Sequence, residues 1–377
     1  MWATAVRREP LPRCRPLYLR SVQYIVGGGT SPFYVLPAEV TALRVLFFGM
    51  EGRFSRAPLA ALLTAELEVC AVVIPRPAGV AGDGAPLRVL PPPRRRPRAL
   101  PIATAASEPT IVGLAWAHGV PVLEVGRLAH PETLTALHAL RPDVLCVACF
   151  PRLLPRELLD LARHGGLNVH PSLLPAYRGP APLFWVFHGQ TSHSPSASTS
   201  ASVQSTGADA RPGAPLWLPN EGLGNAGVTV HLLDDHADTG DIVTQAPIVL
   251  PDGITYDAAE RICSQEGARL LVEALEAIAA GRSMRRPQPQ VDLPTAPVPA
   301  NADFVITPDW SARRAYNFIR GVGEWGRPMT ISMGDEHFIV REAVSYDELA
   351  TMSEPMQRVG RCLRIRCSPG VLTVTSA

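Results

Sequence analysis

Short apolar runs alternate with helical segments over the first half of the chain, and this alternation constrains the fold more than any other feature. A strand followed by a helix and a further strand is typical of a doubly wound α/β fold with a mainly parallel sheet. The strands expected on this basis span 43–48, 67–74, 120–125, 142–150 and a segment that contains Asn168 and His170. Strands are also expected over 228–233 and 242–250.

Helices are expected between these strands. They span 56–65, with Ser55 as a possible N-cap, 109–118, 131–140 and 155–164. A longer helix is expected from about Thr255 to Ala280. The segment 75–101 is expected to be a loop, because prolines are spaced through it. The first strand is not followed by a G-x-G-x-x-G turn, so no dinucleotide site is expected.

Composition sets limits on the class of protein. The 377 residues are 46% hydrophobic, which is enough for one to three domains with their own cores. All 35 basic residues are Arg, which excludes a Schiff-base lysine mechanism. The Cys count is odd, and Cys146 and Cys149 lie in an apolar run, so we expect them to pack in the core and to bind no metal. No apolar run approaches the ~18–20 residues that span a bilayer, so a soluble protein without a membrane partner is expected.

The most informative stretch runs from 166 to 190 and reads GLNVHPSLLPAYRGPAPLFWVFHGQ. Asn168 and His170 are two residues apart, so in a strand they face the same side. Pro171 ends the strand, and the prolines that follow indicate a stiff loop at the strand's carboxyl end, where open α/β sheets bind ligands. A second stretch, GVTVHLLDDHADTGDIVTQ over 227–245, reads as a strand followed by an aspartate-rich loop. Its aspartates lack the spacing of a calcium loop, so we expect one of them to face His170.

Together these stretches resemble the signature of the 10-formyltetrahydrofolate-dependent formyltransferases. The resemblance rests on Asn-x-His-Pro-Ser-Leu-Leu-Pro, on the Arg-Gly that follows, and on the Asp-x-Gly at Asp238. It covers roughly residues 43–345. It implies a Rossmann-like formyltransferase domain with a small C-terminal OB-like β-barrel domain.

The resemblance also implies the site residues. The catalytic set would be Asn168, His170 and Asp238, with 10-formyltetrahydrofolate as co-substrate and no metal. The loop after the strand would bind substrate through Ser172, Leu173, Leu174, Pro175, Arg178 and Gly179. We expect preorganised donors to stabilise a tetrahedral oxyanion, with Asn168 and His170 as candidates. The proton transfer needs an acid/base group near neutral pH, and His170, whose pKa an ionised Asp238 would raise, suits this role. The resemblance also allows Asp238 to shuttle protons through water, and the division of roles between the two residues stays open.

The tRNA-directed members of the family carry a basic loop after the second strand. The segment 75–101 resembles it through Arg94, Arg95, Arg96 and Arg98, and such clusters neutralise phosphates. The expected acceptor is therefore initiator methionyl-tRNA, formylated for translation initiation by a monomeric, cytoplasmic enzyme. Two alternatives stay open: a formyltransferase acting on an amino-sugar nucleotide, and a non-catalytic RNA-binding relative.

The domain organisation follows from composition and from the resemblance. Residues 43–281 would form the catalytic domain, 282–302 a proline-rich linker and 303–377 the OB-like domain. Residues 191–227 are a Ser/Ala/Pro-rich insertion expected to be disordered. Residues 1–42 are an Arg-rich, acid-poor extension. They are compatible with a transit peptide, which would place the protein in an organelle matrix, and equally with a disordered extension.

Overall fold

The computed structural model describes residues 42–65, 67–77, 84–92, 109–189, 223, 226–282, 284–289, 293 and 295–376. Three predicted segments lie wholly or mostly outside these residues. They are the extension over 1–42, the insertion over 191–227, and the basic segment with Arg94, Arg95, Arg96 and Arg98. Their predicted structures and roles therefore stay predictions.

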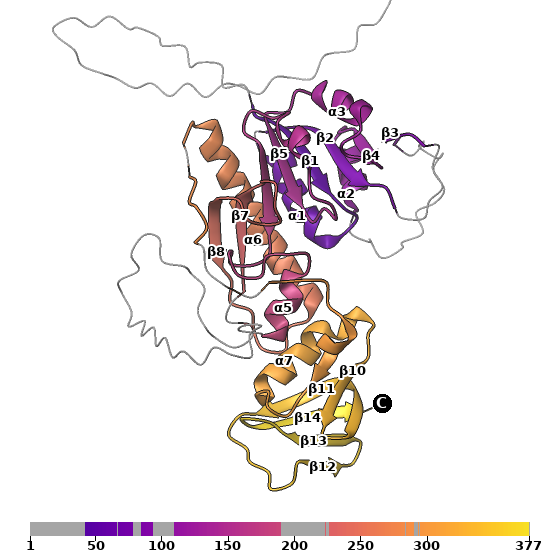
Figure 1. Ribbon diagram of the computed structural model, residues 1–377, viewed down its shortest axis with the longest axis vertical. Coiled ribbons are helices and arrows are strands. Elements are labelled where there is room, and N and C mark those ends of the chain that lie inside the picture. Colours follow the sequence, from indigo (N-terminus) through magenta and orange to yellow (C-terminus); the bar gives the residue numbers. More distant parts are fainter. Residues whose placement is uncertain are drawn as a thin grey trace, which may run out of the picture. The chain divides into compact units, whose positions relative to one another are not determined.

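An eight-stranded sheet forms the centre of the first fold unit, in the order β3-β4-β2-β1-β5-β6-β7-β8 (Figure 1). The five strands from β4 to β6 in this order are parallel, and β3, β7 and β8 pair antiparallel with their neighbours. The mainly parallel sheet predicted from the sequence is thus confirmed. Its strands are β1 (Arg44–Gly49), β2 (Glu68–Pro75), β3 (Leu87–Leu90), β4 (Val122–Val125), β5 (Val144–Ala148), β6 (Gly166–His170), β7 (Gly227–Leu232) and β8 (Ile242–Pro247).

Helices cover both faces of this sheet. Alternate residues of β1 enter different cores: Val45 and Phe47 pack in one hydrophobic cluster, and Leu46 and Phe48 in the other. The first cluster includes α1, α2 and α6, and the second includes α3 and α4. This is the doubly wound arrangement. The helices are α1 (Arg53–Thr64), α2 (Ile111–Ala117), α3 (Pro131–His138), α4 (Arg156–Leu159), α5 (Pro182–His188) and α6 (Tyr256–Ala279).

Several local expectations were wrong. Ser55 does not cap α1. It lies inside the helix, accepts a hydrogen bond from Met50 N, and donates to Ala148 O at 2.6 Å, so it joins the ends of β1 and β5. The loop expected over 75–101 contains the edge strand β3, which pairs with β4. The helix expected over 155–164 forms only the single turn α4. Cys146 is buried as expected, whereas Cys149 is exposed.

The proline-rich loop after β6 contains α5, which was not predicted. Pro182 is at its first turn, where proline is tolerated, and all seven of its side chains are buried. A helix without a polar face gives no 3.6-residue pattern, so periodicity could not reveal it.

A separate six-stranded sheet follows, in the order β12-β13-β14-β11-β10-β9, and α7 (Ala312–Val322) packs against it. It is consistent with the predicted small barrel domain. The sequence predicts strands in this part over 326–332, 336–344, 361–367 and 370–376, so β9 and β12 were not predicted. The strands are β9 (Val305–Ile306), β10 (Met329–Met333), β11 (Glu336–Asp347), β12 (Met356–Val359), β13 (Cys362–Arg366) and β14 (Val371–Ser376), with short 3-10 turns at Asn301–Phe304 and Gly323–Trp325.

Candidate active site

Four polar side chains meet on one face of β6 and β7. Asn168 and His170 come from β6, and His231 on β7 lies directly opposite Asn168 in the antiparallel register. Asp238 reaches them from the loop between β7 and β8. Its Oδ1 accepts a hydrogen bond from Asn168 Nδ2 at 3.3 Å, and its Oδ2 lies 3.6 Å from His170 Nδ1. The structure therefore places Asn168, His170 and Asp238 in one cluster.

Hydrogen bonds fix the tautomers in this cluster. His170 Nε2 lies 3.0 Å from the carbonyl oxygen of Tyr177, which can only accept, so Nε2 carries a proton and Nδ1 of the neutral ring is free. His231 Nδ1 donates in the same way to Leu232 O at 2.8 Å. His231 Nε2 lies 3.1 Å from Asn168 Nδ2, which can donate to it, and 3.4 Å from Asp238 Oδ1. Both hydrogens of the Asn168 amide are thus used, one toward His231 and one toward Asp238.

The protonation states of His170 and Asp238 follow from their burial and from the charged and polar groups beside them. Burial lowers the pKa of His170 below its ordinary value, and although the Asp238 carboxylate acts in the opposite direction, burial prevails. The raised pKa expected from the sequence was therefore wrong in sign. Burial alone would raise the pKa of Asp238, but the imidazoles of His170 and His231 and the Gly179 N–H outweigh it, so the pKa lies far below its usual range. The cluster therefore pairs an ionised carboxylate with a neutral imidazole.

Sequence reasoning missed two members of this environment. His231 is 1% exposed, and its signal was a pair of polar residues, Thr229 and His231, at alternate positions of an apolar strand. Gln288 is 6% exposed and comes from the predicted linker. Its Nε2 donates to Asp238 O at 2.9 Å and to Gly240 O at 2.7 Å. No local pattern distinguishes it from the neighbouring glutamine in a proline-rich segment.

The predicted substrate-binding loop divides into a buried and a half-buried part. The side chains of Ser172, Leu173, Leu174 and Pro175 are buried. The Ser172 hydroxyl donates to Ala176 O at 2.8 Å, which makes it part of the loop's own structure. Arg178 and Gly179 are half-buried beside the cluster, and Gly179 N donates to Asp238 Oδ2 at 2.9 Å. A role in substrate binding stays a prediction for all six.

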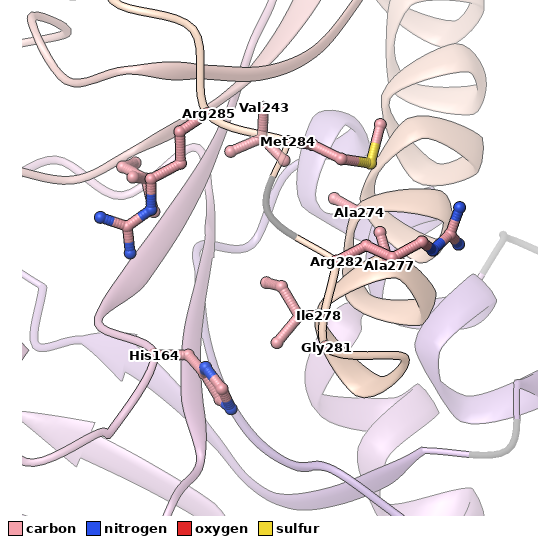
Figure 2. Close-up of a pocket in the computed structure, with 10 residues that line it drawn as sticks. His164, Val243, Ala274, Ala277, Ile278, Gly281, Arg282, Met284 and Arg285 are labelled. Atoms are coloured by element: carbon pink, nitrogen blue, oxygen red, sulfur yellow. The ribbon is translucent and has the colours of Figure 1, made fainter.

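A cavity of about 210 Å³ lies elsewhere, between the end of β7, β8 and the last turns of α6 (Figure 2). Its lining is mainly apolar, with His164, Arg282 and Arg285 at its margin. Figure 2 shows the Arg282 guanidinium pointing away from His164, so these two side chains do not converge on one point. None of the clustered residues lines this cavity, and we do not assign the chemistry to it.

Comparison with known proteins identifies the family. The model of the family described as "Formyl transferase" matches residues 43–199. A methionyl-tRNA formyltransferase of Moorella thermoacetica is 30% identical over 342 residues, which is 89% of this chain and 91% of that protein. Another, of Synechococcus sp. (strain JA-3-3Ab), is 33% identical over 74% of this chain and 71% of that protein. The chain belongs to the methionyl-tRNA formyltransferase family.

The fold agrees with membership of the methionyl-tRNA formyltransferase family. The N-formyltransferase of Helicobacter canadensis, solved with folinic acid and dTDP-3-aminofucose, superposes with a TM-score of 0.56. The alignment covers 89% of this chain and 99% of that one at 12% identity, so it speaks for the fold alone. In the part of the chain that the structure describes, no helix is long and apolar enough to cross a membrane, and no group of three or more His, Cys, Asp or Glu side chains could hold a metal ion.

Proposed function

We propose that this protein transfers the formyl group of 10-formyltetrahydrofolate to the α-amino group of initiator methionyl-tRNA. The observation that carries the proposal is the convergence of Asn168, His170 and Asp238 on one face of β6, in a chain of this family. We propose further that residues 43–281 perform the chemistry and that residues 303–377 contact the tRNA.

The attacking group must be a neutral amine, and an ordinary α-amino group has a pKa of about 7.7–8.0. A base is therefore useful near neutral pH. His170 is neutral there because burial lowers its pKa. Its free nitrogen is Nδ1, since Nε2 donates to Tyr177 O. We assign Nδ1 as the atom that accepts the proton, and Asp238, 3.6 Å away, as the group that stabilises the imidazolium.

Formyl transfer replaces one bond at the formyl carbon by another. The amine nitrogen forms a bond to the formyl carbon, and the carbonyl oxygen becomes an oxyanion. The proton lost by the amine passes to His170 Nδ1 and then to the departing folate nitrogen as its bond to the formyl carbon breaks. Asn168 can donate to the oxyanion by exchanging one of its two present acceptors, His231 Nε2 or Asp238 Oδ1.

The basic segment with Arg94, Arg95, Arg96 and Arg98 is proposed to contact the phosphates of the tRNA. This rests on its charge and on its place after the second strand. Arg178 and Gly179 are proposed to contact the donor or the aminoacyl group, because they are the half-buried part of the loop beside Asp238.

The test is formyl transfer from labelled 10-formyltetrahydrofolate, measured separately with methionyl-tRNA and with an amino-sugar nucleotide as acceptor. Turnover with methionyl-tRNA that falls steeply, but stays measurable, in Asp238→Asn supports the proposal. If only the amino-sugar nucleotide is formylated, the acceptor is the amino sugar and not methionyl-tRNA. A wild-type protein that binds methionyl-tRNA and transfers nothing supports the non-catalytic alternative.

A further inference from the structure

The segment that joins the two sheets takes part in the site. Gln288 lies in the proline-rich stretch predicted as a linker, and its side chain is buried. Its Nε2 donates to the backbone oxygens of Asp238 and Gly240, and its Oε1 accepts from Arg178 Nε at 3.1 Å and Arg178 Nη2 at 2.6 Å. A glutamine amide offers two hydrogens and two lone pairs, so every one of these is used.

Gln288 joins two parts of the chain that both belong to the surroundings of the Asp238 carboxylate. Asp238 has φ 56°, a left-handed conformation that is uncommon for a residue with a side chain. Gln288 holds the carbonyl of this same residue. On the other side Gln288 holds Arg178, and the next residue, Gly179, donates its N–H to Asp238 Oδ2. The Gln288 side chain therefore contacts both the backbone carbonyl of Asp238 and Arg178, the residue before the Gly179 N–H that donates to the Asp238 carboxylate.

Backbone contacts from the same segment enclose the loop. Ala296 N donates to Arg178 O at 2.7 Å, and Ala181 N donates to Ala296 O at 3.1 Å. Gly179 has φ +127°, and a Cβ there would lie 2.6 Å from Ala296 O. The loop beside Asp238 is therefore packed against this segment too closely for any side chain at position 179.

We propose that Gln288 is a positioning residue that holds Asp238 at the distance from His170 required for formyl transfer. The expected loss of turnover rests on the proposed function. The placement of Asp238 by Gln288 rests on hydrogen bonds alone. Gln288→Glu is the informative variant, because it keeps the size of the side chain and the contact with Arg178. It loses both donors and directs a carboxylate at two carbonyl oxygens.

The kinetic test compares Gln288→Glu and Gln288→Ala with Gln357→Ala, which removes an exposed glutamine from β12. We expect kcat to fall about 10- to 100-fold in the Gln288 variants, as for small displacements of catalytic groups. We expect the Gln357 variant to match wild type. In the Asp238→Asn background, Gln288→Ala should lower kcat no further, since the group that it positions no longer carries charge.

A second readout does not depend on turnover. The His170 imidazole is titrated by NMR in wild type, Gln288→Ala and Asp238→Asn. Its surroundings are Asp238, His231 and the Tyr177 carbonyl. If Gln288 positions Asp238, its removal lowers the His170 pKa toward the value in Asp238→Asn.

Three results would overturn the inference. They are an unchanged His170 titration in a folded Gln288→Ala protein, wild-type kcat in both Gln288 variants, and losses that multiply in the double variant. If wild type transfers no formyl group, the proposed function fails, and the NMR titration still decides the role of Gln288.

Discussion

At the scale of single residues, His170 shows two opposing effects on one imidazole. Burial disfavours the cation, and the Asp238 carboxylate favours it. The sequence indicated Asp238 as the partner of His170, because the Asn-x-His and Asp-x-Gly motifs together resemble the signature of the formyltransferases. The sign of the pKa shift could not be predicted, since it depends on how completely Tyr177 and the rest of the loop enclose the ring.

The role of His170 can be tested by substitution. His170→Ala removes the atom proposed to carry the proton, so kcat should fall by about 10²–10⁴-fold, the usual contribution of a general acid–base group. His118→Ala, which changes an exposed histidine at the end of α2, should retain wild-type kcat. Thermal unfolding of both variants checks that they fold. Turnover within threefold of wild type in a folded His170→Ala protein would remove His170 from the mechanism.

At the scale of elements, the strands β1, β2 and β5 were predictable, because central parallel strands are continuous apolar runs. The strands β4 and β6 were predictable from the alternation of strands and helices, although Glu124 interrupts the one and Asn168 and His170 interrupt the other. The strand β3 was not, since its four residues form an edge and are flanked by prolines. The helix α5 was not, because it is buried all round. Partners of α5 come from α7 and from the 3-10 turn after it: the Phe184 ring lies 5.0 Å from that of Trp325 and 5.7 Å from that of Phe318. Such contacts are set by tertiary packing and leave no local pattern.

The approach of α5 to α7 gives a matched pair of glycine variants. A Cβ on Gly321, inside α7, would overlap the Phe187 ring of α5, whereas a Cβ on Gly323, just past the helix, meets only Met329 Cε at 3.9 Å. Gly321→Ala should therefore destabilise by about 1–3 kcal/mol through overpacking, despite the better helix propensity of alanine. Gly323→Ala should leave the melting temperature unchanged or raise it. Equal melting temperatures for the two variants would contradict the close approach.

At the scale of the whole molecule, Asp252 joins the segment after β8 to the second sheet. It accepts hydrogen bonds from Tyr346 Oη at 2.6 Å, Asn317 Nδ2 at 2.8 Å and Arg313 Nε at 3.0 Å. Burial would raise its pKa, but these donors prevail and the pKa lies below its ordinary value.

A carboxyl group with a lowered pKa in the folded state stabilises above its unfolded pKa, and the contribution disappears as the pH falls through the folded pKa. Asp252→Asn should therefore lower stability by about 1–2 kcal/mol near pH 7, a figure reduced for partial exposure. The difference from wild type in urea midpoint should be constant above about pH 5 and should shrink as the pH falls below about 4, the ordinary pKa of an aspartate. Asp309→Asn, an exposed aspartate before α7, is the control and should match wild type throughout. A difference that is independent of pH would exclude the ionic contribution.

The proposed contact between the basic segment and the tRNA phosphates can be tested through the salt dependence of binding. Changing Arg94, Arg95 and Arg96 to Ala should raise KM for methionyl-tRNA and reduce the slope of binding against salt by up to about three, or roughly one for each phosphate that is no longer neutralised. Turnover at saturation should change little. The control removes Arg156, Arg163 and Arg269, three exposed arginines that pair with carboxylates. An unchanged salt slope in the first variant would remove this segment from the tRNA interface.

The segment that holds Gln288 also passes along β8, where Ile242 and Arg286 exchange backbone hydrogen bonds at 2.8 and 2.9 Å. This pairing covers part of an outer strand of the eight-stranded sheet. A recombinant fragment that stops at Gly281, the natural choice from the composition of the chain, would uncover that edge and leave its donors and acceptors open to strands of other molecules. Such a fragment should therefore self-associate more than one that extends to about residue 300, which keeps the Ile242–Arg286 pairing.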